Sequence, residues 1–172
     1  TGVGGGIILD NKLWNGRNGA AGEIGHMTVG ESLYNCGCGK NGCLETFASA
    51  TALVRYAQFL LQTKASSLSA QLDAKAIFDA AQRGDEVAVL SVERLIRYLA
   101  IGIVNLINVF DPDVIAIGGG VAYAGDQLFI PLVQQIQANR LVDSLDLPLV
   151  LQAALGNDAG IIGAAMLGIQ DE

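Results

Sequence analysis

The sequence predicts an α/β fold from three features: its glycine content, its helical apolar patterns and its short apolar runs. The chain has 172 residues, 51% hydrophobic and 16% charged, so it can bury the core of one globular domain. Its 22 glycines are close to twice an average share of about 7% and predict many turns or close ligand approaches. Strand and helix patterns that alternate along one chain are typical of α/β domains.

The first 29 residues are expected to form a β-hairpin followed by a short strand. Residues 7–9 and 12–14, apolar except for Lys12, flank Asp10 and Asn11, which tolerate the positive φ angles of a tight hairpin turn. A segment rich in glycine, alanine and asparagine follows. Residues 26–29 then fit a second short strand, which leads directly into a loop with three cysteines.

The middle of the chain predicts core-facing helices. Residues 44–62 carry apolar side chains at helical spacing, as one helix or as two divided around Ser49, and residues 74–83 predict a short amphipathic helix. The serine-rich stretch 63–70 between them is expected to be a mobile loop. Asp85 fits the N-cap of a long helix that reaches about residue 110. Its apolar stripe comprises Val92, Leu95, Ile96, Leu99, Ile103 and Leu106.

The last third predicts two strands and two helices. Residues 114–117 form a continuous apolar run that Gly118, Gly119 and Gly120 close, as expected for a strand buried on both faces of a largely parallel sheet. A helix should span about 126–139, a strand 147–152 and a final small-residue helix 158–168.

Composition and charge argue against several kinds of partner. A net charge of −7 makes nucleic acid an improbable ligand of this segment. The most apolar run, 98–110, is interrupted by Asn105 and Asn108 and falls short of the roughly 20 residues of a membrane span, so we expect a buried helix and no membrane partner. The N-terminus shows no signal-peptide pattern, and Thr1 suggests a cut rather than a natural start; a cytoplasmic location is expected.

One histidine and all three cysteines lie within 18 residues. His26, Cys36, Cys38 and Cys43 offer one imidazole and three thiolates, the ligand set of a closed tetrahedral zinc site, and intervening glycines let the loop wrap an ion. An iron–sulfur cluster would need four thiolates, or two with two histidines. The alternative is three buried free cysteines and a core histidine.

Two glycine segments are candidates for nucleotide contacts. Thr1 and Gly2 open a run of glycines that is neither a dinucleotide-binding fingerprint nor a Walker A loop, yet a hydroxyl and bare backbone amides can hold a phosphate. Gly118–Gly120 follow a predicted strand, the position at which open α/β sheets bind ligands. A simple turn and tight strand-to-helix packing are the respective alternatives.

Two carboxylates lie close in sequence to the proposed metal ligands. Glu23 precedes His26 by three residues and Glu45 follows Cys43 by two, so a zinc loop would fix both carboxylates relative to one imidazole. Carboxylates and imidazole are suitable hydrogen-bond partners for sugar hydroxyls. Two solvated glutamates are the alternative interpretation.

Residues 2–7, Gly16 and Gly22 belong to one pattern with four further segments of the chain. These are Gly22-Glu23-Ile24-Gly25-His26, Cys36-Gly37-Cys38-Gly39, Gly42-Cys43-Leu44-Glu45 and Ile117-Gly118-Gly119-Gly120-Val121. In order and spacing, and over the length of the chain, this pattern resembles the signature of the ROK family of repressors and sugar kinases. The resemblance implies the ribonuclease-H-like, actin-type ATPase fold, of which this chain would be the larger C-terminal lobe, with a hairpin start, a mixed sheet, long core helices and a zinc-binding loop.

The resemblance also implies roles for individual residues. His26 would bind zinc through one nitrogen and a sugar hydroxyl through the other, and Glu23 and Glu45 would bind further hydroxyls. Cys36, Cys38 and Cys43 would complete the zinc site. Thr1 and Gly2 would match a phosphate-binding segment, and Gly118, Gly119 and Gly120 an adenosine segment. The catalytic Asp and the first phosphate loop would belong to an N-terminal lobe outside these residues, so no catalytic residue is expected in this chain.

Three hypotheses follow for the parent protein: two functions and a purely structural role. The first is an ATP-dependent hexose kinase that uses Mg²⁺ and the missing Asp, in which case this fragment alone should be inactive. The second is the sugar-sensing lobe of a ROK-family transcriptional repressor. The third is a zinc-stabilised scaffold with neither activity. The intact Gly118–Gly120 segment favours the kinase. The resemblance further implies a homodimer, and the identity of the hexose stays open among glucose, fructose and an N-acetylated hexosamine.

Overall fold

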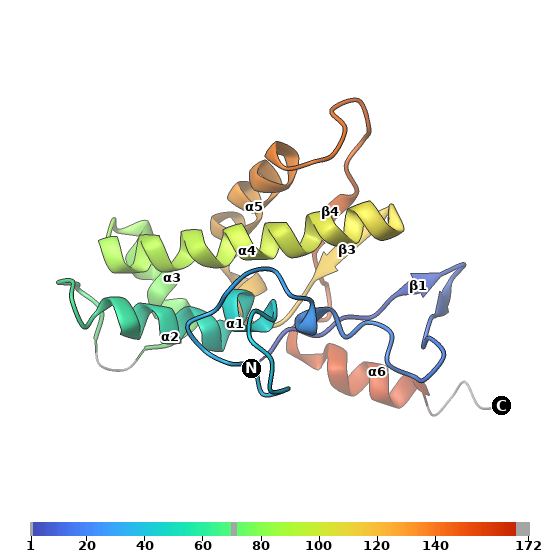
Figure 1. Ribbon diagram of the computed structural model, residues 1–172, viewed down its shortest axis with the longest axis horizontal. Coiled ribbons are helices and arrows are strands. Elements are labelled where there is room, and N and C mark those ends of the chain that lie inside the picture. Colours follow the sequence, from blue (N-terminus) through green and yellow to red (C-terminus); the bar gives the residue numbers. More distant parts are fainter. Residues whose placement is uncertain (1, 70–71, 168–172) are drawn as a thin grey trace.

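The computed structural model describes residues 2–69 and 72–167, arranged as helices around one long central helix with two small sheets beside them (Figure 1). The α-helices are α1 (Glu45–Ala48), α2 (Ala50–Leu60), α3 (Ala74–Gln82), α4 (Glu86–Phe110), α5 (Asp126–Ala138) and α6 (Ala159–Leu167). The strands are β1 (Ile8–Leu9), β2 (Lys12–Leu13), β3 (Val114–Ile117) and β4 (Leu149–Gln152), and the 3₁₀ turns are η1 (Ile24–His26), η2 (Gly120–Ala124) and η3 (Gly156–Asp158).

Helix α4 is the frame on which the other helices pack. Its 25 residues, about 37 Å of helix, run across the molecule, with α1 and α2 on one side and α5 on the other (Figure 1). The predicted stripe is confirmed, because Leu95 is fully buried while Leu99 and Leu106 lie at its partly exposed edge. Within the described part of the chain, no helix is both long and apolar enough to cross a bilayer.

Three helices begin at side chains that cap their first turn. Ser49, Asp73 and Asp85 each accept a hydrogen bond from the backbone N–H three residues later, which satisfies one of the unpaired donors at a helix start. The predicted division around Ser49 and the predicted cap at Asp85 are both confirmed. The two helices α1 and α2 therefore meet at a buried serine, and α1 can turn independently toward the cysteine loop.

Asp85 also anchors the serine-rich loop. Its carboxylate accepts hydrogen bonds from the backbone N–H of Ser67 at 2.7 Å and from the hydroxyls of Ser66 and Ser67 at 2.9 Å, besides the cap bond from Ala88. Partial burial raises the pKa of Asp85, but these hydrogen bonds outweigh it and lower the pKa from its ordinary 3.8 to about 2. The loop that composition marked as mobile is thus tied to the start of α4.

An arginine joins α1 and α2 to α4 through aromatic rings. The Arg94 guanidinium carbon lies 4.7 Å from the centroid of Phe47, 4.4 Å from that of Tyr56 and 5.4 Å from that of Tyr98. Phe47 and Tyr98 stack with centroids 3.9 Å apart. Each contact of this kind contributes about 0.5–2 kcal/mol, so the cluster fixes α1 on α4 through a cation that is partly withdrawn from water. Burial lowers the pKa of Arg94 without neutralising it.

The hairpin forms as predicted, but the mixed sheet does not. β1 pairs antiparallel with β2 around Asp10 and Asn11, whose φ angles of 51° and 59° suit a tight turn. β3 pairs in parallel with β4 in a separate sheet. Among the described residues the expected single mixed sheet is therefore replaced by two two-stranded sheets. Along the chain the two sheets are separated by η1 and by helices α1 to α4.

Two further strand predictions need correction. β3 was expected to be buried on both faces, yet Ile115 and Ile117 pack on the core while Val114 is 49% exposed, because the described helices cover only one face of this sheet. The strand expected at residues 26–29 is wrong for its first residue, because His26 ends the tight turn η1. The rest makes only an isolated bridge, from Thr28 to Cys43.

Replacing Asp85 should weaken the fold in a pH-dependent way. We expect Asp85→Ala to lower the free energy of unfolding by about 1–2 kcal/mol at neutral pH, since the cap and the loop anchor are lost. Because the pKa of Asp85 is lower in the folded chain than in the unfolded chain, its carboxylate stabilises the folded state above about pH 4. This stabilisation disappears as the pH falls toward about 2. The difference between wild type and Asp85→Asn, measured by denaturant unfolding, should shrink over that interval. Asp113→Asn, at an exposed position, should show no such trend.

Candidate functional site

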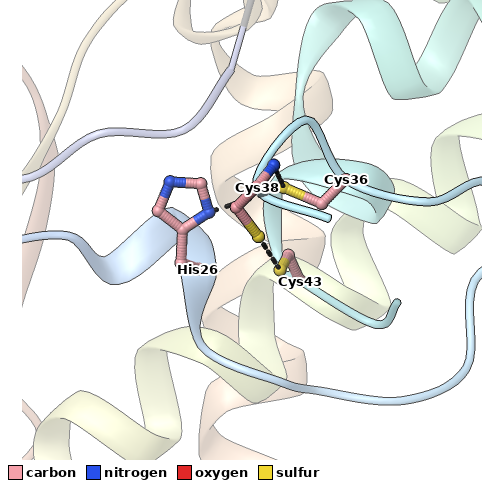
Figure 2. Close-up of side chains that lie close together, drawn as sticks. All are labelled: His26, Cys36, Cys38 and Cys43. Atoms are coloured by element: carbon pink, nitrogen blue, oxygen red, sulfur yellow. Dashed lines mark hydrogen bonds between the residues drawn. The ribbon is translucent and has the colours of Figure 1, made fainter. Parts of the chain in front are cut away.

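The structure brings the four predicted metal ligands together. One donor atom from each of His26, Cys36, Cys38 and Cys43 lies within 4.8 Å of all the others, and the side chains face a common centre (Figure 2). The Nδ1 atom of His26 is 3.5 Å from Cys36 Sγ, and the Sγ atoms of Cys38 and Cys43 are 3.6 Å apart. No other group of this kind occurs in residues 2–69 and 72–167.

Backbone pairing explains how His26 reaches cysteines that follow it by ten or more residues. Met27 O accepts from Leu44 N and Gly42 O accepts from Val29 N, both at 2.9 Å, so residues 27–29 lie antiparallel to residues 42–44. Gly42 has φ +89°, and a side chain there would overlap the carbonyl oxygen of Gly30. Glycine is therefore required at position 42, where the two antiparallel segments lie in close contact.

A tight turn presents the other two thiols. Cys36 N donates to Lys40 O at 2.8 Å, Gly39 N donates to Cys36 O at 3.0 Å, and Cys38 N points at Cys36 Sγ at 3.4 Å. The Asn41 side chain closes the base of the loop by donating to Ser32 O and to Asn35 Oδ1. The loop is thus shaped by its own backbone hydrogen bonds before any ion is considered.

The donor set fits a tetrahedral zinc ion. Zinc–sulfur bonds of about 2.3 Å place two sulfurs of a tetrahedral site about 3.8 Å apart, and Cys38 Sγ and Cys43 Sγ are 3.6 Å apart. A zinc–nitrogen bond of about 2.0–2.1 Å places nitrogen and sulfur about 3.6 Å apart, and His26 Nδ1 and Cys36 Sγ are 3.5 Å apart. Three thiolates and an imidazole are also donors that bind zinc well, whereas magnesium and calcium prefer oxygen ligands. The alternative of three buried cysteines and a core histidine is wrong in its geometry, because Cys38 and His26 are exposed.

The three thiols have different electrostatic environments. Cys36 donates to Glu45 Oε1 at 2.9 Å, and this hydrogen bond raises the pKa of Cys36 to about 12. Burial raises the pKa of Cys43. The backbone N–H of Lys40, and then the Cys36 thiol, stabilise the thiolate of Cys38 and lower its pKa to about 7. A bound divalent cation would displace the remaining protons, because it binds the thiolate form.

The two predicted sugar-binding carboxylates flank this cluster. Glu23 Oε2 lies 3.7 Å from His26 Nε2, on the ring edge opposite the cysteines. Glu45 opens α1 directly after the cysteine loop and reaches back to Cys36. Leu44 and Phe47, both almost fully buried, hold this turn of helix against α4. Glu23, His26 and Glu45 therefore surround one half-exposed site.

The glycine-rich start of the chain packs against the same site. A Cβ atom at Gly2 would lie 2.5 Å from Glu45 Oε2, and one at Gly25 would overlap the carbonyl oxygen of Val3. Bare backbones at these positions allow residues 2–5 to run alongside residues 22–25. The predicted phosphate-contacting residue Gly2 thus adjoins the predicted sugar ligand Glu45, whereas Thr1 lies outside the described residues.

The second glycine segment is open to solvent. Gly119, at φ +81°, and Gly120 would meet no atom within 4 Å of an added Cβ, while Gly118 would meet Ala153 at 3.3 Å. Tight strand-to-helix packing therefore does not account for Gly119 and Gly120. The segment leaves the end of β3 as an exposed backbone ledge, with room for a ligand.

Sequence reasoning missed the pocket beside Glu45. Besides Glu45 and Cys36, side chains of Tyr34, Thr51 and Arg55 line it. Tyr34 donates to the backbone oxygen of Arg55 at 3.1 Å and lies beneath its guanidinium. These residues belong to no motif, and only the packing of α2 against the cysteine loop brings them together.

Comparison with known proteins gives consistent matches over the length of the chain. The ROK family profile matches residues 1–171. The glucokinase of Halalkalibacterium halodurans is 44% identical over 100% of this chain and 54% of its own length. The crystal structure of a ROK family glucokinase from Streptomyces griseus in complex with glucose and AMPPNP is 38% identical, with a TM-score of 0.87 over 97% of this chain and 57% of that one.

A regulator is also similar. A ROK family transcriptional regulator, a homologue of the E. coli MLC protein, is 37% identical with a TM-score of 0.74, over 87% of this chain and 39% of its own. The chain spans about half the length of the glucokinases it matches. The shared fold therefore covers one part of longer proteins, of which some are glucokinases and one is a transcriptional regulator.

Adding one methyl group at Gly25 should distort the site. Gly25→Ala forces the Val3 backbone away, and we expect the free energy of unfolding to fall by about 1–3 kcal/mol. The matched variant Gly4→Ala, whose added methyl meets nothing, should change stability by less than about 0.5 kcal/mol. Denaturant unfolding of both variants tests this, and equal effects would contradict the close backbone contact.

Proposed function

We propose that this chain, which belongs to the ROK family, is the C-terminal lobe of an ATP-dependent hexose kinase in which a structural zinc ion shapes the sugar site. The position of His26 is the observation that carries the proposal. Its Nδ1 faces the cysteines and its Nε2 faces Glu23, so one ring can link a metal to a polar ligand. Glucokinases among the similar proteins support the kinase assignment.

Zinc would be held by His26 Nδ1 and the thiolates of Cys36, Cys38 and Cys43. When bound, the ion would supply a fixed tetrahedral centre and no acid–base or redox chemistry. The chain's own residues would then do the rest: the imidazole ring is held in one orientation, and Nε2 stays free to hydrogen-bond a sugar hydroxyl. Ionising Cys36 would also release Glu45 Oε1, which accepts from the thiol, for a substrate hydroxyl.

The hexose would lie over Glu23, His26 and Glu45. Carboxylate oxygens accept hydrogen bonds from hydroxyls, and bonds to charged groups are worth about 1.5–3 kcal/mol each, so two carboxylates can orient a ring that has many hydroxyls. Glu45 adjoins the backbone of Gly2, so a phosphate held by that segment would lie close to the sugar. Phosphoryl transfer depends mainly on such positioning.

ATP would contact Gly2 and the Gly118–Gly120 ledge, with Thr1 as a further phosphate contact, and Mg²⁺ would offset the negative charge of the phosphates. The open space over Gly119 and Gly120 supports an adenosine contact. The AMPPNP in the similar Streptomyces griseus glucokinase is consistent with this assignment.

The general base and the remaining phosphate loop would come from an N-terminal lobe. The described helix α6 carries exposed apolar side chains, with Ile161 74% exposed, and the β3–β4 sheet has an open face. Both surfaces are suited to packing against that lobe, and their apolar character would promote association if they were left uncovered. The homodimer implied by the family resemblance stays a prediction.

A sugar-sensing repressor lobe is the second candidate, since a ROK family regulator has a similar structure. A repressor needs the sugar contacts but has no use for an adenosine ledge. Titration of the parent protein with AMPPNP and Mg²⁺ distinguishes the two candidate functions. Saturable nucleotide binding supports the kinase, and sugar binding without nucleotide binding supports the repressor.

The purified chain should contain one zinc ion. We expect removal of zinc by a chelator to lower Tm by about 10 °C or more, because structural zinc contributes several kcal/mol to folding. Cys43→Ser should abolish stoichiometric zinc, whereas Glu31→Gln, an exposed acid of the same loop outside the cluster, should retain it. Metal analysis and thermal unfolding measure both effects. A chain without zinc and with a chelator-insensitive Tm would contradict the metal site.

Activity should require the second lobe. The isolated chain is expected to show negligible hexose phosphorylation, and turnover with ATP should appear when the chain replaces the matched region of the Halalkalibacterium halodurans glucokinase. In that chimera, Glu45→Gln should raise KM for the hexose about tenfold or more, since a charged hydrogen bond is lost. Glu31→Gln serves as the control. Robust turnover by the isolated chain would contradict the assignment of the catalytic base to the other lobe.

A further inference from the structure

The three cysteines of the cluster differ sharply in their access to solvent. Cys43 is fully buried and Cys36 is 5% exposed, whereas Cys38 lies at the exposed tip of the loop. Of the three cysteines, Cys38 is therefore the one that a small reagent approaching from solvent reaches first. Reactivity of cysteines toward oxidants follows thiolate character and exposure, and ligation to zinc would keep this sulfur in its thiolate form.

Cys38 also has a second sulfur within easy reach. Its Sγ is 3.6 Å from Cys43 Sγ, and a disulfide needs about 2.05 Å, so closure requires a shift of roughly 1.5 Å. The residues between the two cysteines include Gly39, at φ +86°, and the exposed Lys40 and Asn41, so this loop can absorb the shift. Cys36 is the less available partner, because its Sγ also contacts His26 and Glu45.

We propose that Cys38 is an oxidation site at which a peroxide opens the zinc cluster by forming a Cys38–Cys43 disulfide. In the first step the Cys38 thiolate attacks one peroxide oxygen, the O–O bond breaks, and a sulfenic acid and a hydroxide ion form. In the second step the Cys43 thiolate attacks the sulfenic sulfur, and a second hydroxide leaves. Two thiolates lose two electrons in total and the peroxide gains them.

Loss of two of four ligands releases the ion and removes the constraint on His26. The proposal rests on the zinc site proposed above and adds a reversible control of it. Because the His26 ring would no longer be held through Nδ1, the sugar site would lose its fixed imidazole. A thiol reductant and added zinc should restore the cluster, since a disulfide is reversible and the backbone of the loop is shaped by its own hydrogen bonds.

The test follows zinc and sulfur separately in the zinc-loaded protein. Zinc content is measured first; hydrogen peroxide is then added, and zinc release is followed with a chromogenic chelator. Trypsin cleaves after Lys40, so a disulfide that includes Cys43 joins two peptides, residues 18–40 and 41–55, whereas a Cys36–Cys38 disulfide lies within the first. Fragmentation at Gly37 then tells Cys38 from Cys36. A dimedone probe traps the sulfenic acid at its site of formation.

The expected result is a zinc release that parallels Cys38–Cys43 disulfide formation, with a dimedone adduct at Cys38 and recovery by dithiothreitol plus zinc. Cys38→Ser, if it retains zinc, should release the ion several-fold more slowly, whereas Glu31→Gln should match wild type. Zinc retained under peroxide, or a disulfide or adduct placed on Cys36, would overturn the oxidation site alone. A reconstituted protein without zinc would overturn the metal site and the oxidation site together.

Discussion

The antiparallel contact between residues 27–29 and 42–44 is the constraint on which the rest of the site depends. Two backbone hydrogen bonds, Leu44 N to Met27 O and Val29 N to Gly42 O, place His26 beside Cys43 although many residues separate them in sequence. The contact needs a glycine at position 42, because any side chain there would overlap Gly30 O. Without this contact the histidine and the thiols would form no common donor set, and Glu45 would have no fixed relation to either.

Helix α4 holds this contact in place through side-chain packing. Leu44 packs against Gly102, and the ring of Phe47 stacks on Tyr98 and contacts the Arg94 guanidinium, so the residues on either side of Glu45 are held by α4. Glu45 is therefore placed by packing on one side and by the cysteine loop on the other. A ligand site supported by a long helix and a metal loop is more rigid than one on a free loop.

Most elements could be predicted from the sequence because their signals are local. The hairpin at Asp10 and Asn11, the cap at Asp85 and the apolar stripe of α4 each depend on neighbouring residues. The metal-ligand set of one histidine and three cysteines could also be predicted, since these residues lie close together in the sequence. The exposed face of β3 and the arrangement around Arg94 were not, because burial and aromatic packing depend on distant segments. The contact between Gly2 and Glu45 could not be predicted either, because the only trace of it in the local sequence is the glycine itself.

The central claim is that three sulfurs and the Nδ1 atom of one histidine form a single metal centre that orients the ligand residues. X-ray absorption at the zinc edge measures this directly, because it reports the type, number and distance of the atoms bound to the ion. The account predicts three sulfurs at about 2.3 Å and one nitrogen at about 2.0–2.1 Å. A shell dominated by oxygen or nitrogen, or one with fewer than three sulfurs, would contradict it.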